Sequence, residues 1–384
     1  MTGWRLSRRG DCNLRAEPFR RKWAAQAACF FYGYHSRMVT ARLPQDEIDL
    51  AVDALRDGDV VAFPTETVYG LGADAQNPDA VRKVYELKGR PATHPLIVHI
   101  DHPRLLERWA LSVPPTAQAL ADRFWPGPLT LVLRRAPAVD LAITGGQDTV
   151  AVRVPGHPVA QQLLRAFGSG IAAPSANRYG RVSPTRVEHV REEFGDAVRI
   201  VLDGGDCKIG LESTIVDCVD AVPRVLRPGF ITLTQLRSAV PEIQGRAEAD
   251  SPRVPGSDAK HYAPATPLSI VDGRRLEEVV SQLTDEHEKV AVLALRPPRA
   301  ANKFMTWINA GRRAEVYARE LYVNLRALDK SGAREILVEA VPAGEGWDAV
   351  RDRLHRAASA ENVVAMDPDI AALRADLGED VGRS

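Results

Sequence analysis

A strand, a helix and a second strand follow one another between residues 60 and 100, and this order restricts the fold more than any other feature. Residues 60–63 (VVAF) are typical of a buried strand. Asn77 followed by Pro78 predicts a helix start, because Asn caps helices and Pro fits their first position. Apolar residues then recur at helical spacing until Gly89, and residues 96–100 read as the next strand. This alternation predicts an α/β fold.

The alternation continues on both sides of this unit. Ile48, Val52 and Leu55 mark one face of a helix that should end near Gly58. Ser183 followed by Pro184 resembles the helix start at residue 77. Further strands are predicted at residues 129–133, 150–154, 170–172, 199–202, 214–217 and 225–226. Together they predict a first α/β domain with a twisted open sheet over residues 45–235.

A linker and a second domain are expected after residue 235. Residues 236–264 contain Pro, Gly, Ser and charges without a sustained period, which is typical of a linker. Strands at 268–271, 290–295 and 335–338 then alternate with helices at 275–284, 313–328 and 347–358. This pattern predicts a smaller Rossmann-like α/β domain over 265–375, followed by a tail at 376–384. No Gly-x-Gly-x-x-Gly follows its first strand, so a dinucleotide site is not supported there.

Composition excludes some functional classes. The chain has 50 Lys and Arg against 50 Asp and Glu, so no global field attracts nucleic acid or an acidic membrane. No run of 18 apolar residues predicts a spanning helix. The four cysteines, Cys12, Cys29, Cys207 and Cys218, form no Cys-x-x-Cys pair and are expected to be free thiols in a reducing cytoplasm.

Residues 1–37 differ from the rest of the chain because Arg is frequent and acidic residues are few. Such a composition is found in organellar transit segments, although no clear cleavage site follows. The alternative is an extension that precedes a true start at Met38. Both interpretations stay open.

Two short polar motifs indicate an anion site. Lys88 and Arg90 flank Gly89 where the first helix should end. Two cations that meet about 4 Å apart repel by roughly 4 kcal/mol at an effective dielectric of 20, so an anion such as a polyphosphate is expected between them. A solvated loop would have the same sequence, but a second polar motif, Ser175-Ala176-Asn177, follows the strand predicted at 170–172.

These motifs and their order resemble the YrdC-like L-threonylcarbamoyladenylate synthases in their long, two-domain form, over about residues 45–375. The matching segments are 64–71 (PTETVYGL), 88–91 (KGRP), 94–99 (HPLIVH), 125–130 (WPGPLT), 152–155 (VRVP), 174–177 (PSAN), 212–217 (ESTIVD) and 254–264 (VPGSDAKHYAP). The last of these resembles an interdomain segment that passes over the nucleotide. Residues 257–259 (SDA) depart from the family pattern there, so closure over the nucleotide is expected to differ in detail.

The resemblance implies an enzyme, a nucleotidyltransferase that converts ATP, L-threonine and bicarbonate to threonylcarbamoyl-AMP and pyrophosphate. Mg²⁺ would enter with ATP, held mainly by the phosphates rather than by the protein. The product would serve a separate tRNA threonylcarbamoyl transferase complex, which modifies tRNA next to the anticodon. The resemblance also implies double-stranded RNA binding with a weak tRNA contact, no membrane association, and a cytoplasmic location.

The resemblance also assigns site residues. The catalytic positions are Lys88, Arg90, Ser175 and Asn177. ATP would be bound by Arg90, His94, Thr149, Ser175, Ser183, Arg227 and Tyr262, and threonine by Thr67, His99, Arg153, Ala173 and Ser213. A guanidinium suits a carboxylate because its fork donates two parallel hydrogen bonds, which favours Arg153 as the threonine clamp.

Structural roles for some of these residues stay open. Arg153 also fits an exposed strand position, and His99 also fits a packed histidine. Thr67 and Ser213 also fit a role in satisfying backbone groups at strand ends. Glu66 and Glu212 are alternative magnesium ligands. Residues 125–128 (WPGP) are expected to form a packed corner without a chemical role.

Two other classes compete with the synthase. A non-enzymatic RNA-binding or ribosome-maturation module of the same fold would need a basic surface, which the zero net charge does not favour. A carbamoyl transferase of hydrogenase maturation would carry Cys-x-x-Cys zinc motifs, which this sequence lacks.

Overall fold

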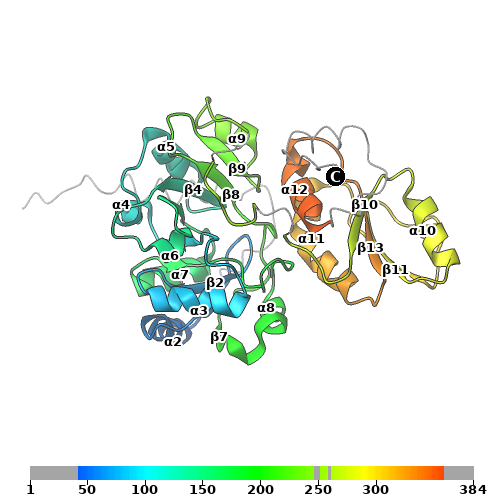
Figure 1. Cartoon of the computed structure of the whole chain (residues 1–384), viewed down its shortest axis with the longest axis horizontal. Helices are drawn as coiled ribbons and strands as arrows, with labels where there is room; N and C mark the ends of the chain where they lie inside the picture. Colours follow the sequence, from blue (N-terminus) through cyan, green and yellow to red (C-terminus); the bar gives the residue numbers. More distant parts are fainter. Residues whose placement is uncertain (1–41, 246–250, 258–260, 359–384) are drawn as a thin grey trace, which may run out of the picture. The chain divides into compact units, whose positions relative to one another are not determined.

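The computed structural model describes residues 42–245, 251–257 and 261–358, and it contains two sheets (Figure 1). The first is mixed and has nine strands in the order β7-β1-β2-β6-β3-β5-β4-β8-β9. Their bounds are β1 Val61–Phe63, β2 Gly70–Asp74, β3 Ile97–His99, β4 Leu129–Arg134, β5 Thr149–Arg153, β6 Ile171–Ala172, β7 Ile200–Val201, β8 Thr214–Asp217 and β9 Arg224–Arg227. Segments far apart in sequence therefore become neighbours, and parallel pairing places His99 of β3 opposite Arg153 of β5.

Helices cover both faces of this sheet. They are α2 Gln45–Arg56, α3 Pro78–Lys88, α4 Leu106–Trp109, α5 Pro115–Phe124, α6 Leu141–Thr144, α7 Pro158–Phe167, α8 Val187–Phe194 and α9 Leu233–Arg237. Ile48 and Leu55 of α2 share one apolar cluster with Leu163 of α7, and Val84 of α3 shares another with Val190 of α8. The α/β fold with a large open sheet is thus confirmed.

Helix α3 has the termini predicted from the sequence. The side chain of Asn77 accepts hydrogen bonds from the backbone N–H groups of Asp79 and Ala80. Gly89 ends the helix at φ 61°, a left-handed conformation that Gly adopts without a Cβ clash. Lys88 is therefore the last helical residue, and Arg90 already belongs to the loop.

The Trp125–Pro128 corner is also packed, as expected. Trp125 is buried, and its indole N–H donates to the carbonyl of Leu129 at 2.7 Å.

The helix predicted after Ser183 and Pro184 is present, but its predicted start is wrong. Helix α8 begins only at Val187, and both earlier residues make other contacts. The Ser183 hydroxyl donates to the Glu212 carboxylate at 2.6 Å, and the Pro184 carbonyl accepts from the N–H of Tyr69 at 2.9 Å. Tertiary hydrogen bonds thus replace the cap that local sequence suggested.

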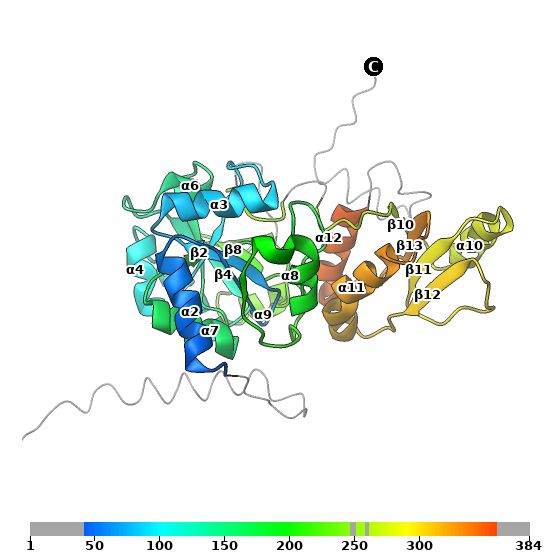
Figure 2. The same ribbon diagram turned by 90° about the horizontal axis from the view of Figure 1, so that it is seen from below.

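The second sheet is entirely parallel, with the order β10-β13-β11-β12. Its strands are β10 Leu268–Val271, β11 Val290–Ala294, β12 Met305–Asn309 and β13 Glu335–Glu339, and its helices are α10 Leu276–Asp285, α11 Ala314–Asp329 and α12 Asp348–Ala357 (Figure 2). The Rossmann-like prediction for this part is confirmed. Strand β12 was missed because it lies at the sheet edge and none of its residues is fully buried, so it lacks the apolar run of a central strand.

Several predictions lie outside the described residues: the leader 1–37 with Cys12, Cys29 and Met38, the departure at Asp258 and Ala259, and the tail 376–384. Cys207 and Cys218 are buried free thiols. Among the described residues, no helix has the length and apolar character needed to cross a membrane.

Candidate active site

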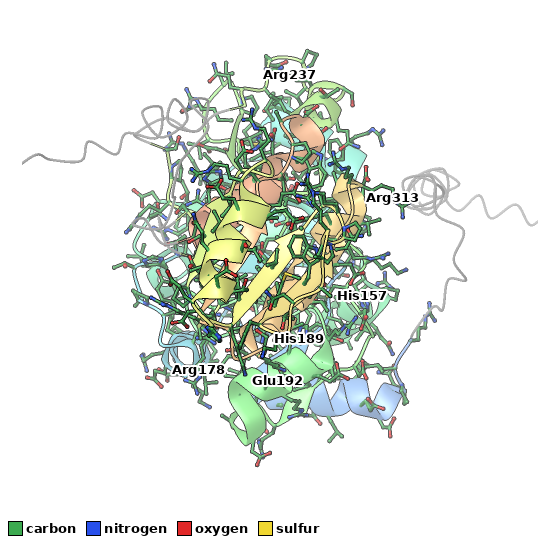
Figure 3. All side chains as sticks on the ribbon, turned by 90° about the vertical axis from the view of Figure 1, so that its right-hand side faces the viewer. His157, Arg178, His189, Glu192, Arg237 and Arg313 are labelled. Atoms are coloured by element: carbon green, nitrogen blue, oxygen red, sulfur yellow. The ribbon has the colours of Figure 1, made fainter. Side chains whose placement is uncertain are left out.

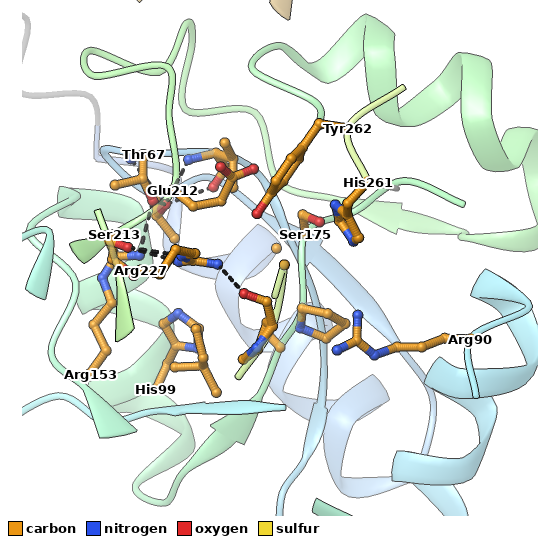
Figure 4. Close-up of a pocket in the computed structure, with 18 residues that line it drawn as sticks. Thr67, Arg90, His99, Arg153, Ser175, Glu212, Ser213, Arg227, His261 and Tyr262 are labelled. Atoms are coloured by element: carbon orange, nitrogen blue, oxygen red, sulfur yellow. Dashed lines mark hydrogen bonds between the residues drawn. The ribbon is translucent and has the colours of Figure 1, made fainter. Parts of the chain in front are cut away.

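A pocket lies against strand β3 and its neighbours β5 and β6, and it collects most of the predicted site residues (Figure 4). Its lining includes Thr67, Arg90, His99, Arg153, Ala173, Ser175, Ser213, Arg227 and Tyr262. These nine residues come from eight separate segments between residues 67 and 262. The sheet brings them together, because His99 and Arg153 end two paired strands and Ala173 follows β6 on the other side of β3.

Arg153 is held at the pocket wall by contacts on both sides of its guanidinium. Nη2 forms an ion pair with Oε1 of Glu66 at 2.6 Å, and Nη1 donates to the hydroxyl of Thr67 at 2.9 Å. Both side chains of the ion pair are at most 4% exposed. The interpretation of Arg153 as an exposed strand residue is therefore wrong. A fixed, buried guanidinium is what a clamp for a carboxylate requires.

Arg227 connects two loops of the pocket. Its Nη2 donates to the carbonyl of Ser213 at 2.8 Å, and its Nη1 donates to the carbonyl of Pro255 at 2.7 Å. The Ser213 hydroxyl lies 2.7 Å from that of Thr130. Arg227 thus joins the loop before β8 to the segment that follows the first domain.

Lys88 and Asn177 lie behind the pocket rather than in its lining. The ammonium of Lys88 donates to the carbonyl oxygens of Ser175, at 2.6 Å, and of Asn177. Burial and the neighbouring Arg90 guanidinium hold the pKa of Lys88 well below its usual value. The Asn177 amide donates to the carbonyls of Arg178 and Arg181 at 2.7 and 2.9 Å. In this structure Lys88 therefore stabilises the Ser-x-Asn turn, while Arg90 lines the pocket.

Three predicted ATP ligands lie outside the pocket lining: His94, Thr149 and Ser183. The ring of His94 packs against Tyr179, with ring centroids 5.4 Å apart. Thr149 is half-buried at the start of β5, and buried Ser183 reaches the pocket only through its bond to Glu212. All five residues predicted to bind threonine therefore line the pocket, whereas four of the seven predicted to bind ATP do.

The two glutamates do not form a magnesium site. Glu66 accepts from Arg153 through Oε1 and from the N–H of Gly156 through Oε2. Glu212 accepts from Ser183 at 2.6 Å and from Arg353 at 2.8 Å. Although burial raises its pKa, Arg353 and Arg227 hold the pKa of Glu212 at about 2. Within the described residues, no group of three or more His, Cys, Asp or Glu side chains is placed to hold a metal ion.

His261 and Tyr262 close one side of the pocket. The N–H of His261 donates to the carbonyl of Arg356 in α12 at 3.0 Å, and the Tyr262 ring lies 4.2 Å from the His261 ring. Burial lowers the pKa of His261 to about 3, and burial together with Arg153 lowers the pKa of His99 to about 3. Both rings are therefore neutral at physiological pH.

Three residues that contact the site were not predicted from the sequence: Tyr179, Tyr322 and Arg353. Tyr179 packs against both His94 and His261, and its ring lies 5.8 Å from the guanidinium carbon of Arg90. Tyr322 and Arg353 reach Glu212 from the second sheet's helices. Tyr179 lies two residues after the Ser-x-Asn motif, which is a usable signal, whereas no local pattern marks Tyr322 or Arg353.

Comparison with known proteins gives two family matches. A model described as "Telomere recombination" (Sua5, YciO and YrdC) matches residues 53–229, and one described as "Threonylcarbamoyl-AMP synthase, C-terminal domain" matches residues 231–359. Threonylcarbamoyl-AMP synthase of Pyrococcus abyssi is 41% identical over 83% of this chain and 96% of its own length. The Bacillus subtilis protein of the same name is 41% identical over 81% and 93%.

A solved structure supports the same relationship across both domains. The crystal structure of P. abyssi Sua5 complexed with L-threonine superposes with a TM-score of 0.79 at 39% identity. It covers 85% of this chain and 98% of that one. The chain therefore belongs to the threonylcarbamoyl-AMP synthase family of nucleotidyltransferases, in its two-domain form.

Proposed function

We propose that this chain converts ATP, L-threonine and bicarbonate to threonylcarbamoyl-AMP and pyrophosphate. The observation that carries the proposal is the convergence of three buried guanidinium groups, Arg90, Arg153 and Arg227, on one pocket. All three substrates bring negative charge, and guanidinium groups donate charge-assisted hydrogen bonds to carboxylate and phosphate oxygens. The name of the relatives and the threonine complex of one of them point to the same substrates.

Threonine would bind at the end of β3 and β5. Arg153 has two N–H groups that are not used in its contacts with Glu66, Thr67 and Gly127, so it can receive a carboxylate while it stays fixed. Thr67 and Ser213 offer hydroxyls for the threonine side chain, and His99 and Ala173 shape the wall. Neutral His99 adds no charge beside the substrate amine.

ATP would extend from the pocket lining toward Tyr179. Arg90, Ser175, Arg227 and Tyr262 line the pocket and are the proposed contacts for its phosphates and sugar. His94 packs against Tyr179, and Ser183 would act through Glu212. Thr149 completes the proposed ATP set.

The chemistry then needs no nucleophile from the protein. The amine of threonine forms a C–N bond to the carbon of bicarbonate, and a C–O bond breaks with release of water, which leaves a carbamate. A carbamate oxygen then attacks the α-phosphorus of ATP as the bond to the pyrophosphate oxygen breaks. The chain orients the reactants and stabilises the charge that develops on the phosphates, through Arg90 and the turn that Lys88 and Asn177 support. Orientation of this kind supplies about 7 to 11 kcal/mol of barrier reduction.

We propose that Mg²⁺ enters with ATP, because the carboxylates near the pocket are already occupied. The activated threonylcarbamoyl group would pass to a separate tRNA transferase complex, which modifies tRNA next to the anticodon. The zero formal net charge fits a transient tRNA contact better than a stable RNA complex.

The direct test is pyrophosphate release from the full chain with ATP, magnesium, bicarbonate and labelled L-threonine. Release should need both threonine and bicarbonate, and it should collapse in Arg90→Ala. The matched control is Arg82→Ala, because Arg82 is an exposed guanidinium of α3 that pairs with the exposed carboxylate of Asp79. A folded wild type that releases no pyrophosphate in response to threonine would contradict the proposal and favour the RNA-binding alternative, which a steep salt dependence of RNA affinity would support.

A further inference from the structure

A buried polar cluster connects the helices of the second sheet with the pocket. The Tyr322 hydroxyl of α11 donates to Oε2 of Glu212 at 2.9 Å and lies 3.2 Å from Oε1. Nε of Arg353, in α12, donates to the same Oε2 at 2.8 Å. The Arg353 side chain is 0% exposed and that of Glu212 is 8% exposed. Glu212 lines the pocket, whereas Tyr322 and Arg353 lie behind it.

The same two side chains enclose Tyr262. The Tyr262 ring is stacked on the Tyr322 ring, with centroids 6.0 Å apart and planes inclined by 23°. The guanidinium carbon of Arg353 lies 5.0 Å from the centre of the Tyr262 ring. A cation close to an aromatic face stabilises this arrangement, more so where water is excluded.

Tyr262 needs such support for a backbone reason. Its φ is 60°, a left-handed conformation that residues with a Cβ seldom adopt because it strains the backbone. Its hydroxyl is buried next to Gly256 and has no hydrogen-bond partner among the described residues. The position of Tyr262 therefore depends on the packing of its ring, and that packing comes from α11 and α12.

Glu212 depends on the same helices. A buried carboxylate is stable only when its oxygens are paired, and three donors meet here: Ser183 from the first domain, and Tyr322 and Arg353 from the second. Loss of one donor leaves the carboxylate free to turn away from Ser183 and the pocket.

We propose that Tyr322 and Arg353 are positioning residues of the active site, which hold the Glu212 carboxylate and the Tyr262 ring in the places that substrate binding requires. The second domain thereby contributes to the site without touching the reactants. The expected loss of activity rests on the proposed function. The expected change in the hydrogen exchange of the segment around Tyr262 does not.

The chain offers matched control variants on the same two helices. Tyr322→Phe removes the hydroxyl from Glu212, and Tyr317→Phe removes a buried hydroxyl of α11 that has no hydrogen-bond partner in the described part of the chain. Arg353→Lys keeps the positive charge but removes the guanidinium that bonds Glu212. Arg351→Lys makes the same change at a guanidinium that bonds Asp348 and the carbonyl of Pro342.

Two measurements on the full chain test the proposal. Hydrogen exchange of the peptide that carries the His261 and Ala263 amides reports on the segment around Tyr262 without any substrate, since these amides donate to Arg356 and Gly180. Steady-state pyrophosphate release gives kcat and KM for ATP and threonine. Melting temperatures show whether each variant is folded.

We expect the amide hydrogens of that peptide to exchange faster in Arg353→Lys than in Arg351→Lys. We expect kcat/KM to fall roughly tenfold in Tyr322→Phe, with a melting temperature close to that of Tyr317→Phe. Equal exchange and equal kcat/KM in each folded pair would overturn the proposal. If the wild type released no pyrophosphate, the proposed function would fail, while the exchange comparison would still decide whether the second domain positions this segment.

Discussion

At the scale of single residues, the site is an arrangement of buried charges that compensate one another. Arg153 is paired with Glu66, Arg227 bonds the carbonyls of two loops, and Glu212 is surrounded by donors. Removing any partner leaves a charge in a place that water does not reach, which costs more than the intact pair contributes. The pocket is therefore sensitive to substitutions that only remove a charge.

Glu66→Gln tests this sensitivity. The amide replaces one carboxylate oxygen with a donor, which then faces either the Arg153 guanidinium or the Gly156 N–H. We expect a loss of about 3 kcal/mol in the free energy of unfolding, measured with denaturant. Glu86→Gln, at an exposed position of α3, should change it by about 0.5 kcal/mol or less. Equal effects would show that the buried pair is not coupled to folding.

His99 makes stability depend on pH. Its pKa of about 3 in the folded chain lies below the ordinary 6.5, chiefly because it is buried, so the unfolded chain takes up the proton first as pH falls. The contribution of neutral His99 to the free energy of unfolding is fully present above pH 6.5. It declines as pH falls toward 3, and about 2 kcal/mol of it is lost at pH 5. The loss of unfolding free energy between pH 7.5 and pH 5 should be smaller by about this amount in His99→Asn. An unchanged loss would contradict the burial of a neutral ring.

At the scale of elements, the ends of helices and strands place the functional groups. Helix α3 begins at the Asn77 cap and ends at Gly89, and its length sets where Lys88 meets the Ser175 and Asn177 carbonyls. The paired strands β3 and β5 end together, so His99 and Arg153 share one wall. A substitution that shifts one end of a helix or strand therefore moves the side chains that its other end places in or near the pocket.

Asn77→Ala should destabilise the chain by about 1 kcal/mol, because two N–H groups at the start of α3 lose their acceptor. Thermal and denaturant unfolding measure this. Gln118→Ala removes a hydrogen bond between two exposed side chains of α5, and it should shift the free energy of unfolding by about 0.5 kcal/mol or less. A similar loss in both variants would argue against a capping effect.

At the scale of the whole molecule, α11 is fixed to α8 by ion pairs between the two domains. Arg326 pairs with Glu193 at 2.8 Å, both 10% exposed, and Lys330 pairs with Glu192 at 2.5 Å on the more exposed side. Figure 3 labels Glu192 and His189, which both belong to α8. The same helix α11 carries Tyr322, so these pairs support the cluster around Glu212.

A double-mutant cycle measures this connection. Arg326→Ala and Glu193→Ala should show a coupling energy of about 2 kcal/mol, since the pair is largely shielded from water. The matched pair Arg334 and Glu288 has the same kind of contact at 2.9 Å but is 65% and 38% exposed, so about 0.5 kcal/mol or less is expected. Coupling of the same size in both cycles would mean that burial does not strengthen the first pair.

The sequence by itself determined the local elements and the chemistry that they offer. Capping by Asn77, the glycine at position 89 and the apolar stripe of α3 depend on neighbours in sequence, so their pattern was readable. The ordered motifs indicated the family and most of the pocket lining. Strands β2 and β12 were not predicted, because β2 (GLGAD) carries two glycines, which strands disfavour, and β12 has no fully buried residue.

Only the tertiary structure decided which polar groups meet. Ser183 bonds Glu212 instead of capping a helix, Lys88 bonds carbonyls behind the pocket, and Tyr322 and Arg353 reach Glu212 from more than 100 residues away. A buried polar group takes whichever partner folding brings within hydrogen-bond distance, and no local pattern encodes that partner. The sequence determines which side chains are able to form the site, and the packing of the two sheets decides which of them form it.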